Sequence, residues 1–220
     1  RKNIRWVVKI MNTKKISIML GGIFPEELPL SDLWCGVDRG ALYLLDKGIN
    51  PLLSCGDFDS INYEQRKEVE QKSKYFRVKD SEDLTDADFA LENILELFDS
   101  VEEIDIYGAT GRRLDHFFGN ILLLNNEKYN SVKVKIIDDN NIITIAHSGQ
   151  NIFEKIEGYK YFSIVPIYED TKMSIKNSKY EVENLVLTLN RPNATSNEFA
   201  NEKAIELEVS SNVLVIYSKD

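Results

Sequence analysis

Residues 103–124 read EIDIYGATGRRLDHFFGNILLL and pass from a predicted strand through a turn into a predicted helix. Residues 103–107 have the character of a β-strand, and apolar side chains follow helical spacing over residues 114–124. The small residues between them are typical of a strand-to-helix turn. A strand that leads directly into a helix is the repeating unit of an α/β fold, so this stretch predicts that class.

The same alternation extends over the first half of the chain. We predict strands at residues 16–20, 33–37, 52–55, 75–78 and 132–137, and helices at residues 41–46, 61–72 and beyond residue 85. Thr85 is well placed to be the N-cap of the last of these helices, with Asp86 and Asp88 in its first turn. Such alternation implies a mostly parallel sheet covered by helices.

The helical period disappears from about residue 141. Short alternating or β-branched runs follow at residues 142–146, 161–167, 185–189, 204–209 and 213–217, separated by Asn, Ser, Gly and Pro. This pattern predicts a small antiparallel β-sandwich. We therefore expect an α/β domain over residues 11–140, beginning at Met11 as the natural start, and a β-sandwich over residues 141–220.

Composition and charge narrow the functional classes. A formal net charge of −9 argues against a protein that binds nucleic-acid phosphates, which requires a basic face. The negative net charge still allows a phosphate substrate, because a divalent metal can bridge acidic side chains to an acidic ligand.

We expect Cys35 and Cys55 to be buried free thiols in a reducing compartment. No apolar run approaches the ~20 residues that span a bilayer, so we expect a cytoplasmic protein without membrane partners.

Two acidic loops follow predicted strands, where ligands bind in open parallel sheets. Gly56-Asp57-Phe58-Asp59-Ser60 carries two carboxylates that can point to the same side. It predicts either an oxygen-ligand metal site or a solvated turn in which Asp59-Ser60 caps the next helix. Residues 80–88 add five carboxylates, and a shared Mg²⁺ would account for both loops.

The third loop, residues 108–116, has the sequence GATGRRLDH and favours anion binding. Its small residues offer backbone N–H groups, and Arg112 and Arg113 add forked cationic donors for phosphate oxygens. A plain turn with surface arginines is the alternative. The chain contains no Walker A, G-x-G-x-x-G or G-x-S-x-G motif, and its two histidines lie on different predicted elements. P-loop kinases, dinucleotide oxidoreductases and multi-histidine zinc sites are therefore disfavoured.

These loops, in this order, resemble the thiamine pyrophosphokinase family. The chain contains the family's G-D-F-D-S at residues 56–60, its D-x-T-D at residues 83–86 and its G-x-x-G-x-R-x-D-H at residues 108–116. Residues 195–199, TSNEF, resemble the family's S-N-E segment, and Lys179-Tyr180 resembles an upstream stretch. Glu82 stands where the family usually has Lys or Gln, and Asn193-Ala194 replaces a frequent Gly.

The resemblance implies a three-layer α/β domain for ATP, a β-sandwich for thiamine and a homodimer with the active site between subunits. It implies an enzyme that transfers pyrophosphate from ATP to thiamine. Asp57, Asp59 and Asp86 would hold Mg²⁺, and Ser196 and Asn197 would contact thiamine. The remaining nucleotide-binding positions that it implies are Asp38, Arg39, Gly40, Asp83, Thr85, Gly108, Thr110, Gly111, Arg112 and His116.

The expected reaction is an in-line attack of the thiamine hydroxyl on the β-phosphorus of ATP, with AMP as the leaving group. Arg113 would steady the phosphate oxygens, and either Asp86 or Asp115 would accept the hydroxyl proton. Two alternatives remain at this point. One is a metal-dependent phosphoesterase built around Asp115-His116, and the other is a binding module without catalysis.

Overall fold

The computed structural model describes residues 14–31, 33–80 and 83–220 of the 220-residue chain. Contacts between Cα atoms divide it into two compact units, one extending to Val134 and the other from Lys135 to Asp220. The division falls within a strand, Lys133–Ile137, whereas the sequence-based boundary follows residue 140. Met11 and Glu82, which the sequence analysis singled out, lie outside the described residues.

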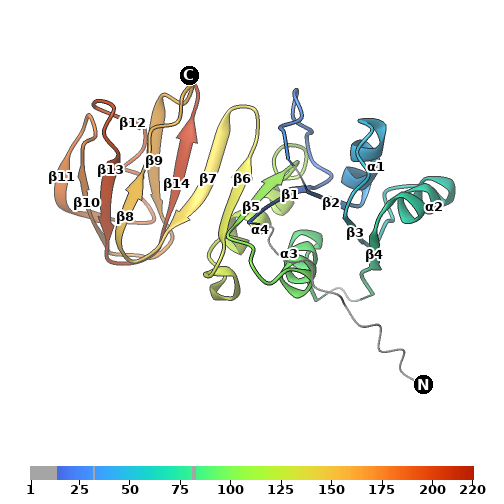
Figure 1. Ribbon diagram of the computed structural model, residues 1–220. Helices are drawn as coiled ribbons and strands as arrows, with labels where there is room; N and C mark the ends of the chain where they lie inside the picture. The colour runs from blue at the N-terminus through green and yellow to red at the C-terminus, as the bar shows by residue number, and fades with distance from the viewer. Residues whose placement is uncertain (1–13, 32, 81–82) are drawn as a thin grey trace. The chain divides into compact units, whose positions relative to one another are not determined.

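A parallel sheet forms the centre of the first unit, as the strand–helix alternation predicted (Figure 1). Its strands lie in the order β5-β1-β2-β3-β4, and each neighbouring pair is parallel. They are β1 (Lys15–Met19), β2 (Trp34–Val37), β3 (Leu53–Gly56), β4 (Tyr75–Val78) and β5 (Glu103–Tyr107). Because β2 and β3 are buried along their whole length, they appear in the sequence as short apolar runs.

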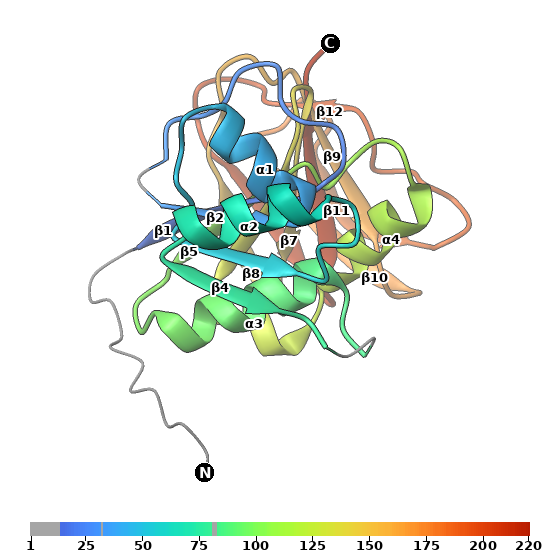
Figure 2. The same ribbon diagram turned by 90° about the vertical axis from the view of Figure 1, so that its right-hand side faces the viewer.

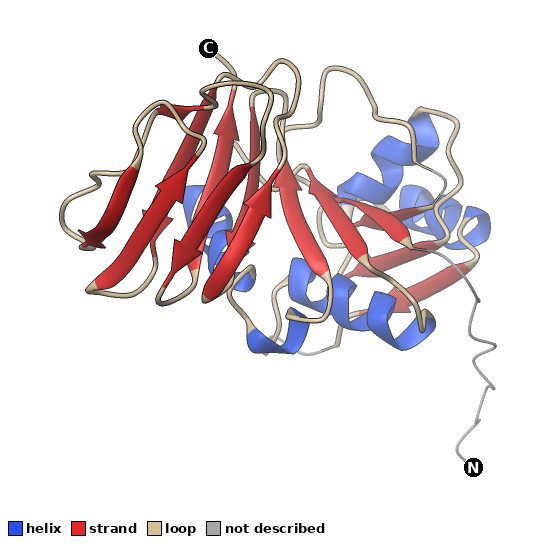
Figure 3. Cartoon of the chain, turned by 60° about the vertical axis from the view of Figure 1, so that its left-hand side comes forward, coloured by secondary structure: helices blue, strands red, loops and turns tan. Residues whose placement is uncertain are grey.

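Helices cover both faces of this sheet. Figure 2 shows α1 and α2 on one face and α3 on the other, which gives the three layers that we expected, and Figure 3 shows helices on both sides of the strands. The helices are α1 (Arg39–Asp46), α2 (Tyr63–Lys72), α3 (Asp86–Leu97), α4 (Leu114–Leu123) and the short 3₁₀ helix η1 (Glu127–Tyr129). Within the described ranges, no helix is long and apolar enough to cross a membrane.

The sequence analysis made predictions about the N-caps of two helices, α3 and α2. Thr85 caps α3 as predicted, because its Oγ1 accepts a hydrogen bond from the Asp88 amide at 3.2 Å. The start of α2 differs. Asn62 caps it in a reciprocal capping box with Gln65, so the interpretation of Asp59-Ser60 as a helix cap is wrong. The acidic loop is therefore not required to begin α2.

The second unit is built from antiparallel strands. One sheet contains them in the order β12-β9-β14-β7-β6, and the other in the order β11-β10-β13-β8. They are β6 (Lys133–Ile137), β7 (Asn141–Ala146), β8 (Gly149–Phe153), β9 (Tyr161–Pro166), β10 (Thr171–Lys176), β11 (Val182–Leu187), β12 (Asn197–Glu198), β13 (Ile205–Val209) and β14 (Val213–Ser218). The sequence analysis missed β8, β10 and β12, whose sequences are short or rich in polar residues.

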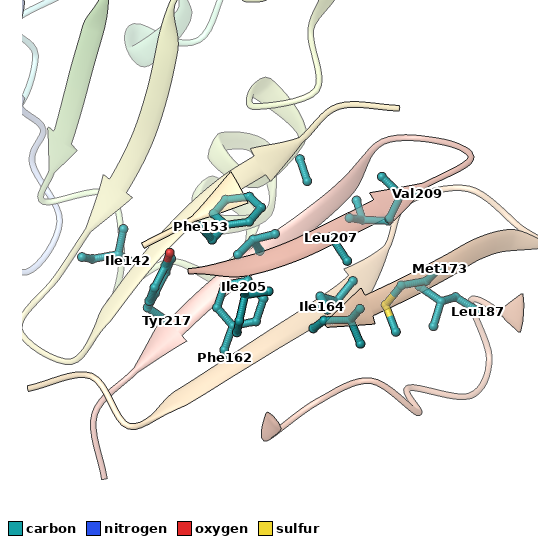
Figure 4. Close-up of a cluster of buried hydrophobic side chains, with 14 residues drawn as sticks. Ile142, Phe153, Phe162, Ile164, Met173, Leu187, Ile205, Leu207, Val209 and Tyr217 are labelled. Atoms are coloured by element: carbon teal, nitrogen blue, oxygen red, sulfur yellow. The ribbon is translucent and has the colours of Figure 1, made fainter. Parts of the chain in front are cut away.

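One apolar core joins the two sheets of the second unit. Phe162 of β9 and Tyr217 of β14 come from one sheet, and Phe153 of β8 and Ile205 of β13 come from the other. Figure 4 shows these side chains gathered between the strands, and the rings of Phe162 and Tyr217 meet edge to face with centroids 5.1 Å apart. This shared core confirms the predicted β-sandwich.

The two cysteines lie in neighbouring strands of the first unit. Cys35 in β2 and Cys55 in β3 are buried free thiols whose Sγ atoms are 4.0 Å apart. The hydrogen bond with the Cys35 thiol and burial both raise the pKa of Cys55, which disfavours the thiolate. This confirms the prediction of buried free thiols and leaves Cys55 poorly suited to act as a nucleophile.

Candidate functional site

A cavity of about 740 Å³ lies at the carboxyl ends of the parallel strands in the first unit. Loops that follow all five strands contribute to its walls. The predicted site residues that line it are Asp38, Arg39, Asp57, Asp59, Asp83, Thr85, Asp86, Gly108, Thr110, Gly111, Arg112, Arg113, Asp115 and His116. This is the edge at which open parallel sheets bind ligands, because the connecting loops there are free to vary.

Gly40 does not line this cavity. It lies in the first turn of α1, where a Cβ atom would come within 2.1 Å of the Met19 carbonyl oxygen. Its position therefore allows the helix to pack closely against the end of β1. Its predicted role in nucleotide binding remains a prediction.

One wall of the cavity is acidic. We use the term acidic wall for Asp38, Asp57, Asp59 and Asp86, which follow β2, β3 and β4. Asp57 Oδ1 accepts a hydrogen bond from the Asp59 amide at 2.9 Å. This short turn allows both carboxylates of the G-D-F-D-S loop to face the same cavity, as the sequence predicted.

Asp38 is held firmly in this wall. Its backbone adopts φ 50°, and its Oδ1 accepts a hydrogen bond from the Phe58 amide at 2.9 Å. Gly56 leaves the space for it, because a Cβ atom at Gly56 would lie 2.0 Å from the same carboxylate oxygen. Gly56 also has φ 135°, a conformation that other residues rarely adopt. The glycine of the motif is therefore needed both for its backbone conformation and for the position of Asp38.

The electrostatics of the acidic wall favour a cation. Burial raises the pKa of the Asp38 carboxyl to about 7, and the nearby charges of Asp86, Asp57 and Asp59 act in the same direction. The Phe58 amide opposes this shift by stabilising the carboxylate. The three neighbouring carboxylates that contribute to this shift place negative charge around Asp38, which a bound cation would offset.

The sequence analysis missed Lys79, which also lines the cavity. Its side chain is only 7% exposed, and its Nζ lies 2.6 Å from Asp86 Oδ1 and donates a hydrogen bond to the Leu84 carbonyl at 3.2 Å. Lys79 directly follows β4, so the rule that ligands bind at the carboxyl ends of parallel strands could have identified it. The acidic loop singled out in the sequence begins at Asp80, one residue after Lys79.

The donor set of the acidic wall fits a hard divalent metal. Its ligands would be carboxylate oxygens, which Mg²⁺ prefers, and Mg²⁺ usually takes one or two carboxylates together with phosphates and water. Apart from the ion pair with Lys79, no hydrogen bond of good geometry reaches the buried Asp86 Oδ1 from the described residues. Among the described residues, no group of three or more Asp, Glu, His or Cys side chains is arranged to hold a metal ion by itself. The wall therefore fits Mg²⁺ that is shared with a phosphate ligand.

A glycine-rich loop forms what we call the opposite wall of the site, because it follows β5, on the other side of β1 from β2, β3 and β4. Gly108 has φ 66° and Gly111 has φ 79°. The Gly22 amide donates to the Gly108 carbonyl at 2.7 Å, and the Ile23 amide donates to the Thr110 carbonyl at 3.0 Å. These bonds fix the loop beside the Gly21-Gly22 turn after β1 and define its shape. Small residues with left-handed backbone conformations are typical of loops that bind phosphate through N–H groups.

Arg113 and Asp115 form an exposed ion pair at the end of this loop. Arg113 Nη2 lies 2.5 Å from Asp115 Oδ2, and Nε lies 3.1 Å from Oδ1. The hydrogen bonds from Arg113 lower the pKa of the Asp115 carboxyl to about 2, and Asp115 in turn raises the pKa of Arg113. Asp115 is therefore a weak proton acceptor as long as it stays paired with Arg113.

The predicted thiamine-contacting residues lie in the second unit. Asn197 is buried, and its side chain is bonded to the backbone amide and carbonyl of Tyr180 at 3.0 and 2.9 Å and to Ser178 Oγ at 3.2 Å. Its neighbour Ser196 is exposed and has φ 59°. The structure therefore connects two stretches that the sequence analysis had singled out separately, Lys179-Tyr180 and the S-N-E segment.

Comparison with known proteins supports both halves of the chain. The family model described as thiamin pyrophosphokinase, catalytic domain, matches residues 24–136, and the model of the vitamin B1 binding domain of the same family matches residues 150–214. The thiamine pyrophosphokinase of Bacillus subtilis is 35% identical over 215 residues, which cover 94% of this chain and 100% of that relative.

Solved structures agree with these matches. A crystal structure of thiamine pyrophosphokinase from Bacillus subtilis superposes with a TM-score of 0.82 at 34% identity and covers 94% of this chain and 100% of that one. A thiamin pyrophosphokinase family protein from Enterococcus faecalis has a TM-score of 0.84 at 29% identity, with the same coverage. The chain belongs to the thiamin pyrophosphokinase family.

Proposed function

We propose that the cavity of the first unit binds ATP together with Mg²⁺ and is the place where pyrophosphate is transferred to thiamine. Membership of the family makes the chain an ATP-dependent enzyme that converts thiamine to thiamine diphosphate. The observation that carries the proposal is the composition of one cavity. It combines an acidic wall suited to a divalent metal with a glycine- and arginine-rich loop suited to phosphate.

In the proposed site, Asp57, Asp59 and Asp86 would hold Mg²⁺. The bound metal would neutralise negative charge on the phosphate oxygens as the transfer proceeds. Asp38 supports this arrangement through its carboxyl group, which the Phe58 amide fixes in the same wall, and a bound cation would favour the ionised form of that group. Asp83, Thr85 and the N-terminal turn of α3 lie at the edge of the same cavity.

The opposite wall is proposed to bind the phosphates through the Gly108–Gly111 backbone and through Arg112 and Arg113. The hydroxyl oxygen of thiamine attacks the β-phosphorus, the bond from that phosphorus to the bridging oxygen of the α-phosphate breaks, and AMP leaves with the electron pair. The hydroxyl proton passes to a carboxylate. We assign Asp115 the orientation of Arg113, because the two side chains are hydrogen-bonded to each other. We assign proton acceptance to Asp86, which lines the cavity and can bind metal through one carboxylate oxygen and a proton through the other.

Thiamine binding is proposed for the second unit, with Ser196 in contact with the substrate. The match of the vitamin B1 binding domain model to residues 150–214 supports this assignment. Asn197 is better suited to shape the binding segment than to contact thiamine, because three of its bonds join it to Ser178 and Tyr180.

We also propose a homodimer that works in the cytoplasm. Leu114, Phe118 and Leu122 recur every four residues along α4 and are 68%, 62% and 65% exposed, an apolar stripe suited to a second copy of the chain. The buried free thiols are consistent with a reducing compartment. Light scattering on the purified chain should give twice the monomer mass, and Phe118→Asp should reduce it to the monomer. An unchanged mass for that variant would exclude α4 as the interface.

The primary test measures AMP formed from ATP and Mg²⁺, with and without thiamine, and the mass of the thiamine product. Thiamine-dependent AMP together with a mass gain of two phosphate groups would establish pyrophosphoryl transfer. ADP with a gain of one phosphate group would contradict it and indicate a simple kinase. Phosphate release without any acceptor would indicate a phosphoesterase.

A further inference from the structure

Lys79 is a buried cation in a wall that is otherwise acidic, and the proposed reaction gives it no role. Its side chain is almost fully enclosed, while its Nζ lies 2.6 Å from the Asp86 carboxylate. Burial of a lysine is costly unless the ammonium is paired and hydrogen-bonded. Asp86 and the Leu84 carbonyl satisfy this requirement. In the structure, therefore, Lys79 compensates the charge of a carboxylate proposed to bind metal.

The backbone of Lys79 is anchored at the site. Its amide donates to the Gly56 carbonyl at 2.8 Å, which joins it to the residue preceding Asp57. The main chain at Lys79 is thus fixed beside the G-D-F-D-S loop, and the four-carbon side chain is the part that can change its direction. The cavity that it lines also contains the Gly108–Arg113 loop, so the space open to the ammonium is the space proposed for the polyphosphate.

A divalent cation and the Lys79 ammonium would compete for Asp86. Both bind through the lone pairs of the carboxylate oxygens, and the two positive charges repel each other at short range. A polyphosphate brought by the metal offers new acceptors for a displaced ammonium. Lysine is suited to such an exchange, because its charge sits on a compact group with rotatable donors.

We propose that Lys79 binds polyphosphate. Its ammonium group stays paired with Asp86 until a divalent cation replaces it at that carboxylate. In the metal-free protein it holds the acidic wall together as an internal counter-ion. When metal and nucleotide bind, its ammonium moves from Asp86 to the phosphate oxygens. This inference rests on the proposed function, since it requires Asp86 to bind the metal.

The experiment measures two binding reactions, neither of which depends on turnover. Mn²⁺ binding without nucleotide is followed by electron paramagnetic resonance. Binding of α,β-methylene-ATP, in which the bond broken by pyrophosphoryl transfer is blocked, is followed by calorimetry at saturating Mg²⁺. The variants are Lys79→Met and Lys79→Arg. Lys72→Met is the matched control, because it removes a lysine from an exposed ion pair with Glu68 on α2, outside the cavity.

Lys79→Met should bind Mn²⁺ about 5-fold more tightly than the unaltered chain, because the competing cation is gone. The same variant should bind α,β-methylene-ATP about 10-fold more weakly, because a charge-assisted contact to phosphate is lost. Lys79→Arg should restore nucleotide affinity to within about 3-fold, since it retains a charged donor. Lys72→Met should change neither affinity.

Three results would overturn the inference. Unchanged affinities in Lys79→Met would mean that Lys79 neither competes with metal nor contacts phosphate. Tighter Mn²⁺ binding with unaltered nucleotide affinity would make it a structural counter-ion only. Failure of the unaltered chain to bind either ligand would remove the proposed function as well. Circular dichroism verifies folding, and if Lys79→Met does not fold, Lys79→Gln takes its place with the same expected directions.

Discussion

The two walls of the cavity are built in different ways. The acidic wall is held by internal bonds: Asp38 accepts from the Phe58 amide, Asp57 accepts from the Asp59 amide, and Asp86 is paired with the nearly buried Lys79. On the opposite side, Arg113 and Asp115 are 67% and 63% exposed and pair with each other. The carboxylates of Asp38, Asp57 and Asp86 are thus held in position before a ligand arrives, whereas Arg113 and Asp115 remain open to solvent.

This difference is in keeping with the two proposed roles, metal binding at the acidic wall and phosphate binding at the opposite wall. A hard metal requires carboxylates at defined positions, and positions are best fixed by packing and hydrogen bonds within the fold. Phosphate oxygens can be reached by long, exposed arginine side chains that adapt to the ligand. The contrast predicts that substitutions in the acidic wall lower turnover strongly, because they disturb the positions of the carboxylates. Substitutions of charged residues in the loop of residues 108–116, which we call the arginine loop, should lower turnover less, because they change charge and not the positions of metal ligands.

The largest effect is expected for the proposed metal ligands. Asp57→Ala or Asp86→Asn should lower turnover by about 10³-fold, because charge neutralisation at the transferring group is lost. Turnover is measured as thiamine-dependent AMP formation at saturating Mg²⁺ and ATP. The control is Asp46→Asn, which alters an exposed carboxylate at the end of α1. Turnover near that of the unaltered chain in Asp57→Ala would refute the metal assignment.

A smaller effect is expected in the arginine loop. Arg113→Gln should lower turnover by about 10²-fold. Arg113→Lys should lower turnover less, because the positive charge remains. Asp115→Asn should reduce turnover only about 10-fold, since it disturbs the orientation of Arg113 without removing its charge. Steady-state kinetics with varied ATP measures all three. A loss in Asp115→Asn as large as that in Asp57→Ala would contradict the proposed difference between the walls.

Two glycines allow the geometry of the acidic wall to be tested separately from backbone strain. Gly56 and Gly48 both have positive φ, but a Cβ atom would meet Asp38 at Gly56 and nothing within 4 Å at Gly48. We expect Gly48→Ala to lower the free energy of unfolding by about 1 kcal/mol. Gly56→Ala should lower it by about 3 kcal/mol, because strain and a steric clash add.

Urea denaturation measures both glycine variants, and turnover should fall only in Gly56→Ala. Equal destabilisation of the two variants would mean that the Asp38 contact does not constrain the wall.

The smallest effect concerns the helix that carries Asp86. Thr85→Ala removes the side-chain cap of α3 and should lower the free energy of unfolding by about 1 kcal/mol. Thr85→Ser retains the hydroxyl and should remain within a few tenths of the original value. Thermal unfolding followed by circular dichroism distinguishes the two. If both variants lost the same stability, the methyl group of Thr85, and not its hydroxyl, would be the stabilising element.

Much of the fold could be predicted from local patterns. The apolar runs of β2 and β3 and the helical spacing of α3 reflect burial, because buried positions are mostly occupied by apolar residue types. Strand β8 has no such apolar pattern. Its sequence, GQNIF, is mostly polar, and it is a strand because its backbone pairs with β13. Sequence patterns report side-chain burial, whereas an edge strand depends on hydrogen bonds to a partner distant in the sequence.

The sequence by itself determined the candidate chemistry. The acidic and glycine-rich motifs, their order and their positions after strands predicted a site for metal and phosphate at one edge of a parallel sheet, and their resemblance indicated the family. Only the tertiary structure decided how the charges are paired. Lys79 with Asp86, Asp38 with the Phe58 amide, and Asn197 with Tyr180 each join separate segments. Such pairings depend on distances of a few ångströms, because electrostatic and hydrogen-bond energies fall off steeply with separation, and the linear order of residues does not contain these distances.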